Sequence, residues 1–130
     1  MSEHIVGSDL YTIQFEYRPE FLVATVCGES DSLEISLQFW SHIHKEVRKH
    51  GYKSVLVLEN LQNTIGTFDT YLLNQQLGQM GFFNIRIAFV DAFPDQSDIN
   101  QFGETVAINR GLVLKVFLCK EEAEQWLLAK

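Results

Sequence analysis

The sequence predicts an α/β protein with a mostly parallel sheet. Three observations favour this class: strict apolar and polar alternation in one segment near the N-terminus, several continuously apolar segments, and stretches of helical periodicity between them. The chain has 130 residues and a formal net charge of −7. This length supports one hydrophobic core, so we expect a single domain over residues 1–130.

The first two expected strands form an antiparallel hairpin. Tyr11–Tyr17 alternates apolar and polar residues, which predicts a strand with one solvent-facing side. Pro19 favours a turn, because proline fixes its own φ angle and donates no backbone hydrogen bond. Residues 21–27 are almost continuously apolar, which predicts a strand covered on both faces.

Helices and apolar strands alternate after the hairpin. The first helix is expected from Asp31 to the stop at His50-Gly51, with an apolar stripe formed by Leu33, Leu37, Trp40, Ile43 or His44, and Val47. Thr67 is expected to cap a second helix through Met80, and Ser97 a third helix that ends at Gly111. The remaining strands are expected at residues 53–59, 84–91 and 112–118, and the last helix at residues 120 to about 128.

The resulting order β-β-α-β-α-β-α-β-α predicts a mostly parallel sheet with an antiparallel N-terminal strand. This order resembles the STAS family and its wider SpoIIAA-like superfamily over Tyr11 to Leu128. The resemblance rests also on Gly28-Glu29-Ser30-Asp31, on residues 104–117, and on residues 120–127, which resemble the final helix of small stand-alone bacterial members of uncharacterised function.

The resemblance implies a SpoIIAA-like (STAS) fold and a non-enzymatic regulatory or protein-interaction module. Some SpoIIAA-like proteins are grouped with the lipid-binding CRAL-TRIO fold, so a small-ligand or lipid-binding protein is the alternative. Members that act as phosphorylation switches carry an Asp-Ser-Ser-Gly-like motif before the second helix, whereas residues 59–67 read Glu-Asn-Leu-Gln-Asn-Thr-Ile-Gly-Thr. The phospho-switch motif is therefore not retained. Thr67 carries the hydroxyl nearest to the place of that motif, so it is either a phosphorylation site or a helix N-cap. Thr64 is the second candidate for phosphorylation.

Two acids end neighbouring expected strands. Glu59 and Asp91 would lie at the carboxyl edge of the sheet, where α/β proteins form clefts. They form either an acidic pair that holds a cation or a proton, or two solvated strand-end acids. No phosphate-binding glycine motif or nucleophile elbow is present, and His42 and His44 point to different faces of a helix. We therefore expect no enzymatic activity, no cofactor and no metal site; an enzyme that uses Glu59 and Asp91 is the minority hypothesis.

Five apolar residues fall outside the expected core. Ile35 and Phe39 lie beside the stripe of the first helix, Phe68 and Tyr71 near the start of the second, and Phe93 in a loop. We expect them to form a candidate rim for a protein partner, a second copy of the chain, a small ligand or a lipid. Scattered surface residues, or packing under a loop, are the alternative.

Composition excludes several other classes. The acidic balance argues against a nucleic-acid partner, because phosphate binding depends on Lys and Arg. The apolar segments are far shorter than the ~20 residues that span a membrane. The N-terminal residues lack the basic start and apolar core of a signal peptide, so we expect a cytoplasmic location. Cys27 and Cys119 are expected to be buried reduced thiols, with a reactive pair as the alternative.

Overall fold

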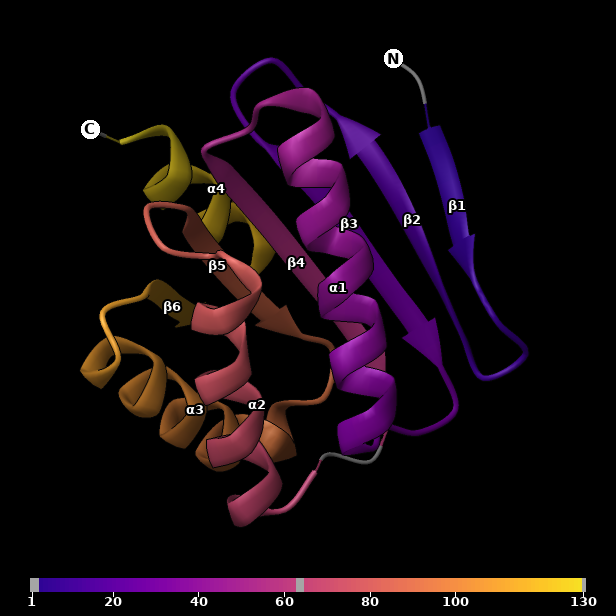
Figure 1. Ribbon diagram of the computed structural model, residues 1–130, viewed down its shortest axis with the longest axis vertical. Coiled ribbons are helices and arrows are strands. Elements are labelled where there is room, and N and C mark those ends of the chain that lie inside the picture. Colours follow the sequence, from indigo (N-terminus) through magenta and orange to yellow (C-terminus); the bar gives the residue numbers. More distant parts are fainter. Residues whose placement is uncertain (1–2, 63–64, 130) are drawn as a thin grey trace.

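The computed structural model describes residues 3–62 and 65–129, which form a six-stranded sheet with helices on both faces (Figure 1). The strands follow chain order across the sheet: β1 (Glu3–Gly7), β2 (Tyr11–Tyr17), β3 (Leu22–Gly28), β4 (Ser54–Leu61), β5 (Arg86–Asp91) and β6 (Val113–Phe117). The helices are α1 (Leu33–His50), α2 (Thr67–Met80), α3 (Ser97–Asn109) and α4 (Lys120–Leu128), with a short 3₁₀ helix η1 (Pro94–Gln96) before α3. The expected mostly parallel α/β fold is confirmed.

The sheet changes from antiparallel to parallel at β3. β1, β2 and β3 pair antiparallel, whereas β3, β4, β5 and β6 pair parallel. Successive right-handed crossovers in one direction along a sheet leave their helices on one face, and α1, α2 and α3 lie together in this way. The helix α4 covers the opposite face and contacts β4, β5 and β6 (Figure 1).

The first strand, β1, was not expected. It pairs with β2 from Glu3 opposite Glu16 to Gly7 opposite Thr12. The turn after it requires glycine, because a Cβ on Gly7 would lie 2.3 Å from the Tyr11 carbonyl oxygen. A five-residue edge strand with one free edge carries too short an apolar pattern to be distinguished from a loop. The order therefore has one more strand than the sequence predicted.

The main core lies between the sheet and α1, α2 and α3, and it contains two residues that were expected on the surface. Ile35 is 7% exposed and Phe39 is fully buried. The ring of Phe39 packs edge-on against Tyr11 of β2, with centroids 6.4 Å apart, and also against Trp40. The buried face of α1 is thus rotated from the expected stripe, so that Leu33 and Leu37 lie at its border. Ile35 and Phe39 cannot belong to an exposed rim.

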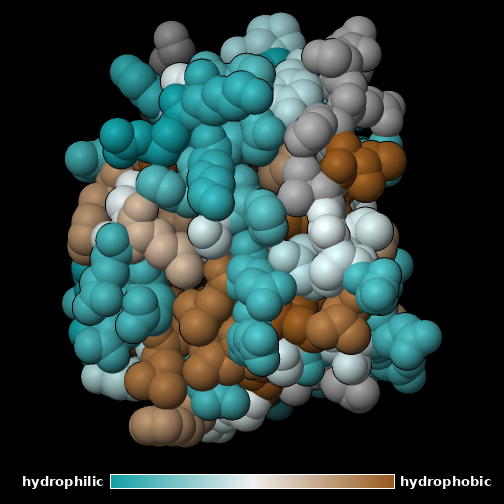
Figure 2. Space-filling model, turned by 45° about the vertical axis from the view of Figure 1, so that its right-hand side comes forward, coloured by the Kyte–Doolittle hydropathy of each residue, from teal (hydrophilic) through white to brown (hydrophobic). Residues whose placement is uncertain are grey.

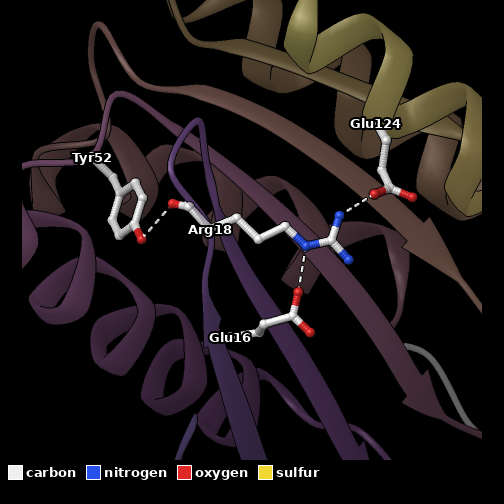
Figure 3. A network of polar contacts seen from close by, with 4 residues as sticks. All are labelled: Glu16, Arg18, Tyr52 and Glu124. Carbon is white, nitrogen blue, oxygen red and sulfur yellow. Dashed lines mark hydrogen bonds and ion pairs between the residues drawn. The ribbon is translucent and has the colours of Figure 1, made fainter. Parts of the chain in front are cut away.

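A smaller apolar cluster lies under α4, on the other face of the sheet. Its buried members are Phe21, Val23, Leu56, Ala88, Ala123 and Leu127. Arg18 ties this side to the hairpin, because its guanidinium donates to Glu16 and to Glu124 of α4 (Figure 3). The Tyr52 hydroxyl donates to the Arg18 carbonyl oxygen at 2.8 Å. The short final helix is therefore held by both apolar and charged contacts.

Helix ends agree with the sequence at some positions and differ at others. Gly111 has a φ of +87° after α3, as expected for a left-handed cap. The N-cap of α2 is Gly66 and not Thr67, which is the first helical residue and makes no capping bond. Gln96 likewise takes the cap position expected for Ser97, because η1 extends the helical path backwards. Both cysteines are free and half-buried.

Candidate functional site

Three carboxyl groups gather at the carboxyl edge of the parallel strands. Glu59 and Asp91 are register partners on β4 and β5, so the expected pair does lie side by side. Asp31 joins them from the loop between β3 and α1, and its charge acts on Glu59. We call Asp31, Glu59 and Asp91 the acid cluster.

Asp91 is held in place by three donors. Its Oδ1 accepts from the Phe93 backbone N–H at 2.9 Å. Its Oδ2 accepts from the Gln96 side-chain amide at 2.6 Å and from the Asn100 side-chain amide at 2.9 Å. The loop after β5 and the start of α3 are thereby fastened to this carboxylate, which gives Asp91 a structural task in addition to any binding role.

Asp31 is bonded locally but lies in a poorly hydrated position. Its Oδ1 accepts from the Ser32 backbone N–H at 2.7 Å, and the Ser36 hydroxyl lies 2.7 Å from Oδ1 and donates to the carboxylate. Burial raises the pKa of Asp31 to about 6, and the charge of Asp91 adds to this rise, whereas the bonds from Ser36 and Ser32 oppose it.

Glu59 is the least solvated member of the acid cluster. Its side chain is 6% exposed, and among the residues that the structure describes it makes no hydrogen bond or ion pair. Burial raises the pKa of Glu59 well above its ordinary value, and the charges of Asp31 and Asp91 raise it further. This carboxyl therefore holds a proton more tightly than an ordinary glutamate.

A small cavity opens beside Glu59, between the sheet and the helices α1, α2 and α3. Its volume is about 60 Å³. The polar part of its wall includes Asp31, Glu59, Asn74, Asn100 and Glu104, and its apolar part includes Phe89 and Leu114. The Glu104 carboxylate is engaged, since it accepts from the Val116 backbone N–H at 2.7 Å. The cavity thus combines acceptor oxygens with apolar surface.

The expected rim is only partly present. Phe68 is 71% exposed and Tyr71 is 40% exposed, both on the first turns of α2, whereas Phe93 is half-buried. On the face shown in Figure 2, brown apolar side chains gather mostly in the lower half, the end at which α1 and α2 begin in Figure 1. We call Phe68 and Tyr71 the α2 rim. Thr67 beside it is exposed.

The α2 rim continues into an open groove between α2 and α3. The Arg110 guanidinium stacks over the Tyr71 ring, 4.8 Å from its centroid, and donates to the Tyr71 hydroxyl. Phe83, 48% exposed, also lines this groove, whose volume is about 500 Å³. One aromatic ring is therefore anchored by a cation, while Phe68 projects freely.

Sequence reasoning missed Asp31, Gln96 and Asn100 as parts of the site. Asp31 follows the first parallel strand, so the topological rule that singled out Glu59 and Asp91 was able to find it. The two amides carried no such signal, because their contact with Asp91 depends on how η1 leads into α3.

Two kinds of site are absent from the described residues. Over residues 3–62 and 65–129, no three His, Cys, Asp or Glu side chains are arranged to hold a metal ion. Within the same ranges no helix combines the length and the apolar content that crossing a membrane requires.

Comparisons with known proteins extend to the fold alone. No protein-family model matches the chain, and no curated protein matches it. Among solved structures, the NMR structure of the protein TM1081 is similar, with a TM-score of 0.50 and 13% sequence identity. The alignment covers 89% of this chain and 88% of TM1081. The chain therefore shares its overall α/β arrangement with a solved structure along nearly its whole length.

Proposed function

We propose that this protein is a non-enzymatic regulatory module of the STAS, or SpoIIAA-like, kind that binds a protein partner through the α2 rim. The observation that carries the proposal is the exposure of Phe68, whose aromatic side chain is 71% accessible on the first turn of α2. Aromatic residues are enriched among those that dominate protein interfaces. A partner docking here would also cover Tyr71, one turn further along α2.

Burial of Phe68 under a partner contributes a substantial part of a binding free energy. An exposed fraction of 71% corresponds to roughly 140 Å² for a side chain of about 200 Å². At about 25 cal/mol per Å², complete burial contributes up to about 3.5 kcal/mol. Loss of this contact would weaken a complex by up to about 300-fold.

The proposal includes no phosphorylation switch, because residues 59–67 lack the corresponding motif. Thr67 remains a candidate modification site. It is exposed beside the α2 rim and makes no capping bond, so a phosphate there would add charge to the proposed docking surface.

The alternative function is binding of a small ligand or a lipid. The cavity beside Glu59 favours a small ligand over a lipid. Its volume of about 60 Å³ is far below the roughly 300–1,000 Å³ of sites that bind drug-sized molecules. A carrier would retain its ligand during purification under mild conditions, which native mass spectrometry detects.

The docking proposal is tested with Phe68→Asp and the matched control Leu118→Asp. Leu118 is 78% exposed and lies between β6 and α4 rather than on α2. The tagged wild type and each tagged variant are purified from cells of the source organism together with any bound partner. The affinity of each protein for the recovered partner is then measured by titration. Self-association is measured separately by analytical ultracentrifugation, since the partner can be a second copy.

We expect Phe68→Asp to lose the complex while Leu118→Asp retains it, with circular dichroism unchanged in both. Equal binding by wild type and Phe68→Asp would refute docking at the α2 rim. Equal loss in both variants would assign the effect to general surface charge and would also count against the proposal.

A further inference from the structure

The cavity beside Glu59 lies apart from the α2 rim and has features that protein docking does not explain. The Glu59 carboxyl group, which is 6% exposed, lines this small cavity and makes no hydrogen bond with the described residues. Leaving such a group buried and unpaired is costly, and native proteins avoid it unless the group has a task. The question is which ligand chemistry would satisfy it.

Four side chains in the cavity wall donate hydrogen bonds to groups other than Glu59. The Ser36 hydroxyl donates to Asp31, and the Thr70 hydroxyl donates to the Gly66 carbonyl oxygen at 2.9 Å. The Asn74 side-chain amide donates to the Thr70 carbonyl oxygen at 2.9 Å, and that of Asn100 to Asp91. None of these bonds reaches Glu59, so its oxygens are acceptors without a donor.

The neighbouring amide leaves a second acceptor unused. The Gln96 Nε2 group donates to Asp91, but Gln96 Oε1 is buried and has no hydrogen-bond partner among the described residues. Gln96 itself lies outside the cavity wall, so a ligand in the cavity would not contact it. Gln96 Oε1 and the Glu59 carboxyl thus accept no hydrogen bond from the described residues, which favours a ligand with N–H groups.

Charge and size restrict the ligand further. The cavity wall holds Asp31, Glu59 and Glu104 and no Lys, Arg or His among the described residues, so a cation is favoured over an anion. A volume of about 60 Å³ admits about four to six heavy atoms, given roughly 10–15 Å³ for one water-sized probe. No group of three potential metal ligands is found in the described residues, which argues against a metal ion.

The apolar part of the wall indicates that the cation carries carbon. Trp40 and Phe89 stack with ring centroids 6.3 Å apart, and Ile99, Leu114 and Val116 also line the space. Aromatic and aliphatic surface suits a short alkyl chain, and aromatic rings attract organic cations. We propose that this cavity binds a small primary alkylammonium ion, with Glu59 as the carboxylate that accepts its N–H groups.

The ligand must compete with protons for Glu59. Burial and the charges of Asp31 and Asp91 raise the pKa of this carboxyl, and Glu104 is the remaining acid in the wall. An ammonium ion binds the charged carboxylate, so its affinity is expected to rise with pH as the proton leaves Glu59. A neutral ligand that accepts a hydrogen bond from protonated Glu59 would show the opposite trend.

The test uses the intact chain and ethylammonium chloride, followed by calorimetry and by ¹H–¹⁵N NMR. Sodium chloride at the same ionic strength, sodium acetate and ethanol serve as inorganic, anionic and neutral probes. We expect saturable binding of ethylammonium alone, with shifts centred on Trp40, Asn74 and Asn100, which line the cavity. Equal responses to sodium chloride, or tighter binding of Mg²⁺ or Ca²⁺, would overturn the proposal.

Glu59→Gln supplies the decisive variant, because it keeps the shape and removes the charge. Its affinity for ethylammonium is expected to fall at least about tenfold, as for the loss of a charge-assisted hydrogen bond. Glu29→Gln, an exposed acid at the same end of the sheet, is expected to bind like wild type. If Glu59→Gln fails to fold, Asp31→Asn is used instead, with the same expected weakening. Unchanged affinity in the folded variant would overturn the assignment, and leaves docking at the α2 rim unaffected.

Discussion

Replacing Glu59 with glutamine is expected to stabilise the domain at neutral and alkaline pH. Burial raises the pKa of Glu59 well above 4.5, and the charges of Asp31 and Asp91 raise it further. The folded chain therefore keeps a proton that the unfolded chain releases above about pH 4.5. The free energy of unfolding of the wild type must then fall as the pH rises from that value toward the pKa of the folded state.

The size of the effect follows from the number of protons. A difference of one bound proton changes the free energy of unfolding by about 1.4 kcal/mol per pH unit. Glu59 contributes up to this slope, whereas Glu59→Gln has no proton to release. Asp31, whose pKa is raised to about 6, contributes with the same sign in both proteins between about pH 3.8 and pH 6. The advantage of the variant should therefore grow with pH.

Urea unfolding at a series of pH values measures this difference. Trp40 is 3% exposed in the main core, so its fluorescence should report unfolding directly. Glu29→Gln, which removes an exposed acid, should follow the wild-type curve at every pH. A constant difference between wild type and Glu59→Gln across the pH series would refute the account of a buried, poorly solvated carboxyl.

Two further predictions concern packing and capping. Phe39→Ala should lower the free energy of unfolding by about 3–5 kcal/mol in urea titrations, because Phe39 is fully buried against Tyr11 and Trp40. A loss below about 1 kcal/mol would instead place Phe39 on the surface. Ser32→Ala should cost about 1 kcal/mol, because its hydroxyl accepts the Ile35 backbone N–H at 3.1 Å as the N-cap of α1. Thr67→Ala should cost less than about 0.5 kcal/mol, because Thr67 is not the N-cap, and equal losses at the two positions would contradict the assignment of Gly66 as the N-cap of α2.

The parallel part of the fold was predictable because each strand and helix has a clear local pattern. The strand β4 is buried almost continuously, and the stop at Gly51 and the cap at Gly111 both use a positive φ that glycine adopts readily. The same local patterns bring Glu59 and Asp91 together once the strands are parallel neighbours. The sequence thus predicts which strand ends carry the two acids, and the pairing of β4 with β5 places them side by side.

The sequence predictions were wrong where contacts between elements distant in the sequence determine the local structure. Helical periodicity defines an apolar arc on α1 but not which side of that arc faces the sheet. Ile35 and Phe39 were therefore predicted to lie outside the core, whereas Tyr11 of β2 contacts Phe39 and both belong to the core. The strand β1 forms only because it pairs with the free edge of β2, a contact that its own sequence does not indicate. Thr67 has the right chemistry for a cap, but the chain enters the helix one residue earlier, where the Gly66 carbonyl oxygen accepts the Thr70 N–H at 2.9 Å.

Docking through the α2 rim is tested most directly by amide hydrogen exchange of the chain alone and bound to its recovered partner. We expect new protection concentrated over residues 67–75, around Phe68 and Tyr71, with α4 unchanged. Protection over α4 with no change at α2 would contradict the proposed docking surface.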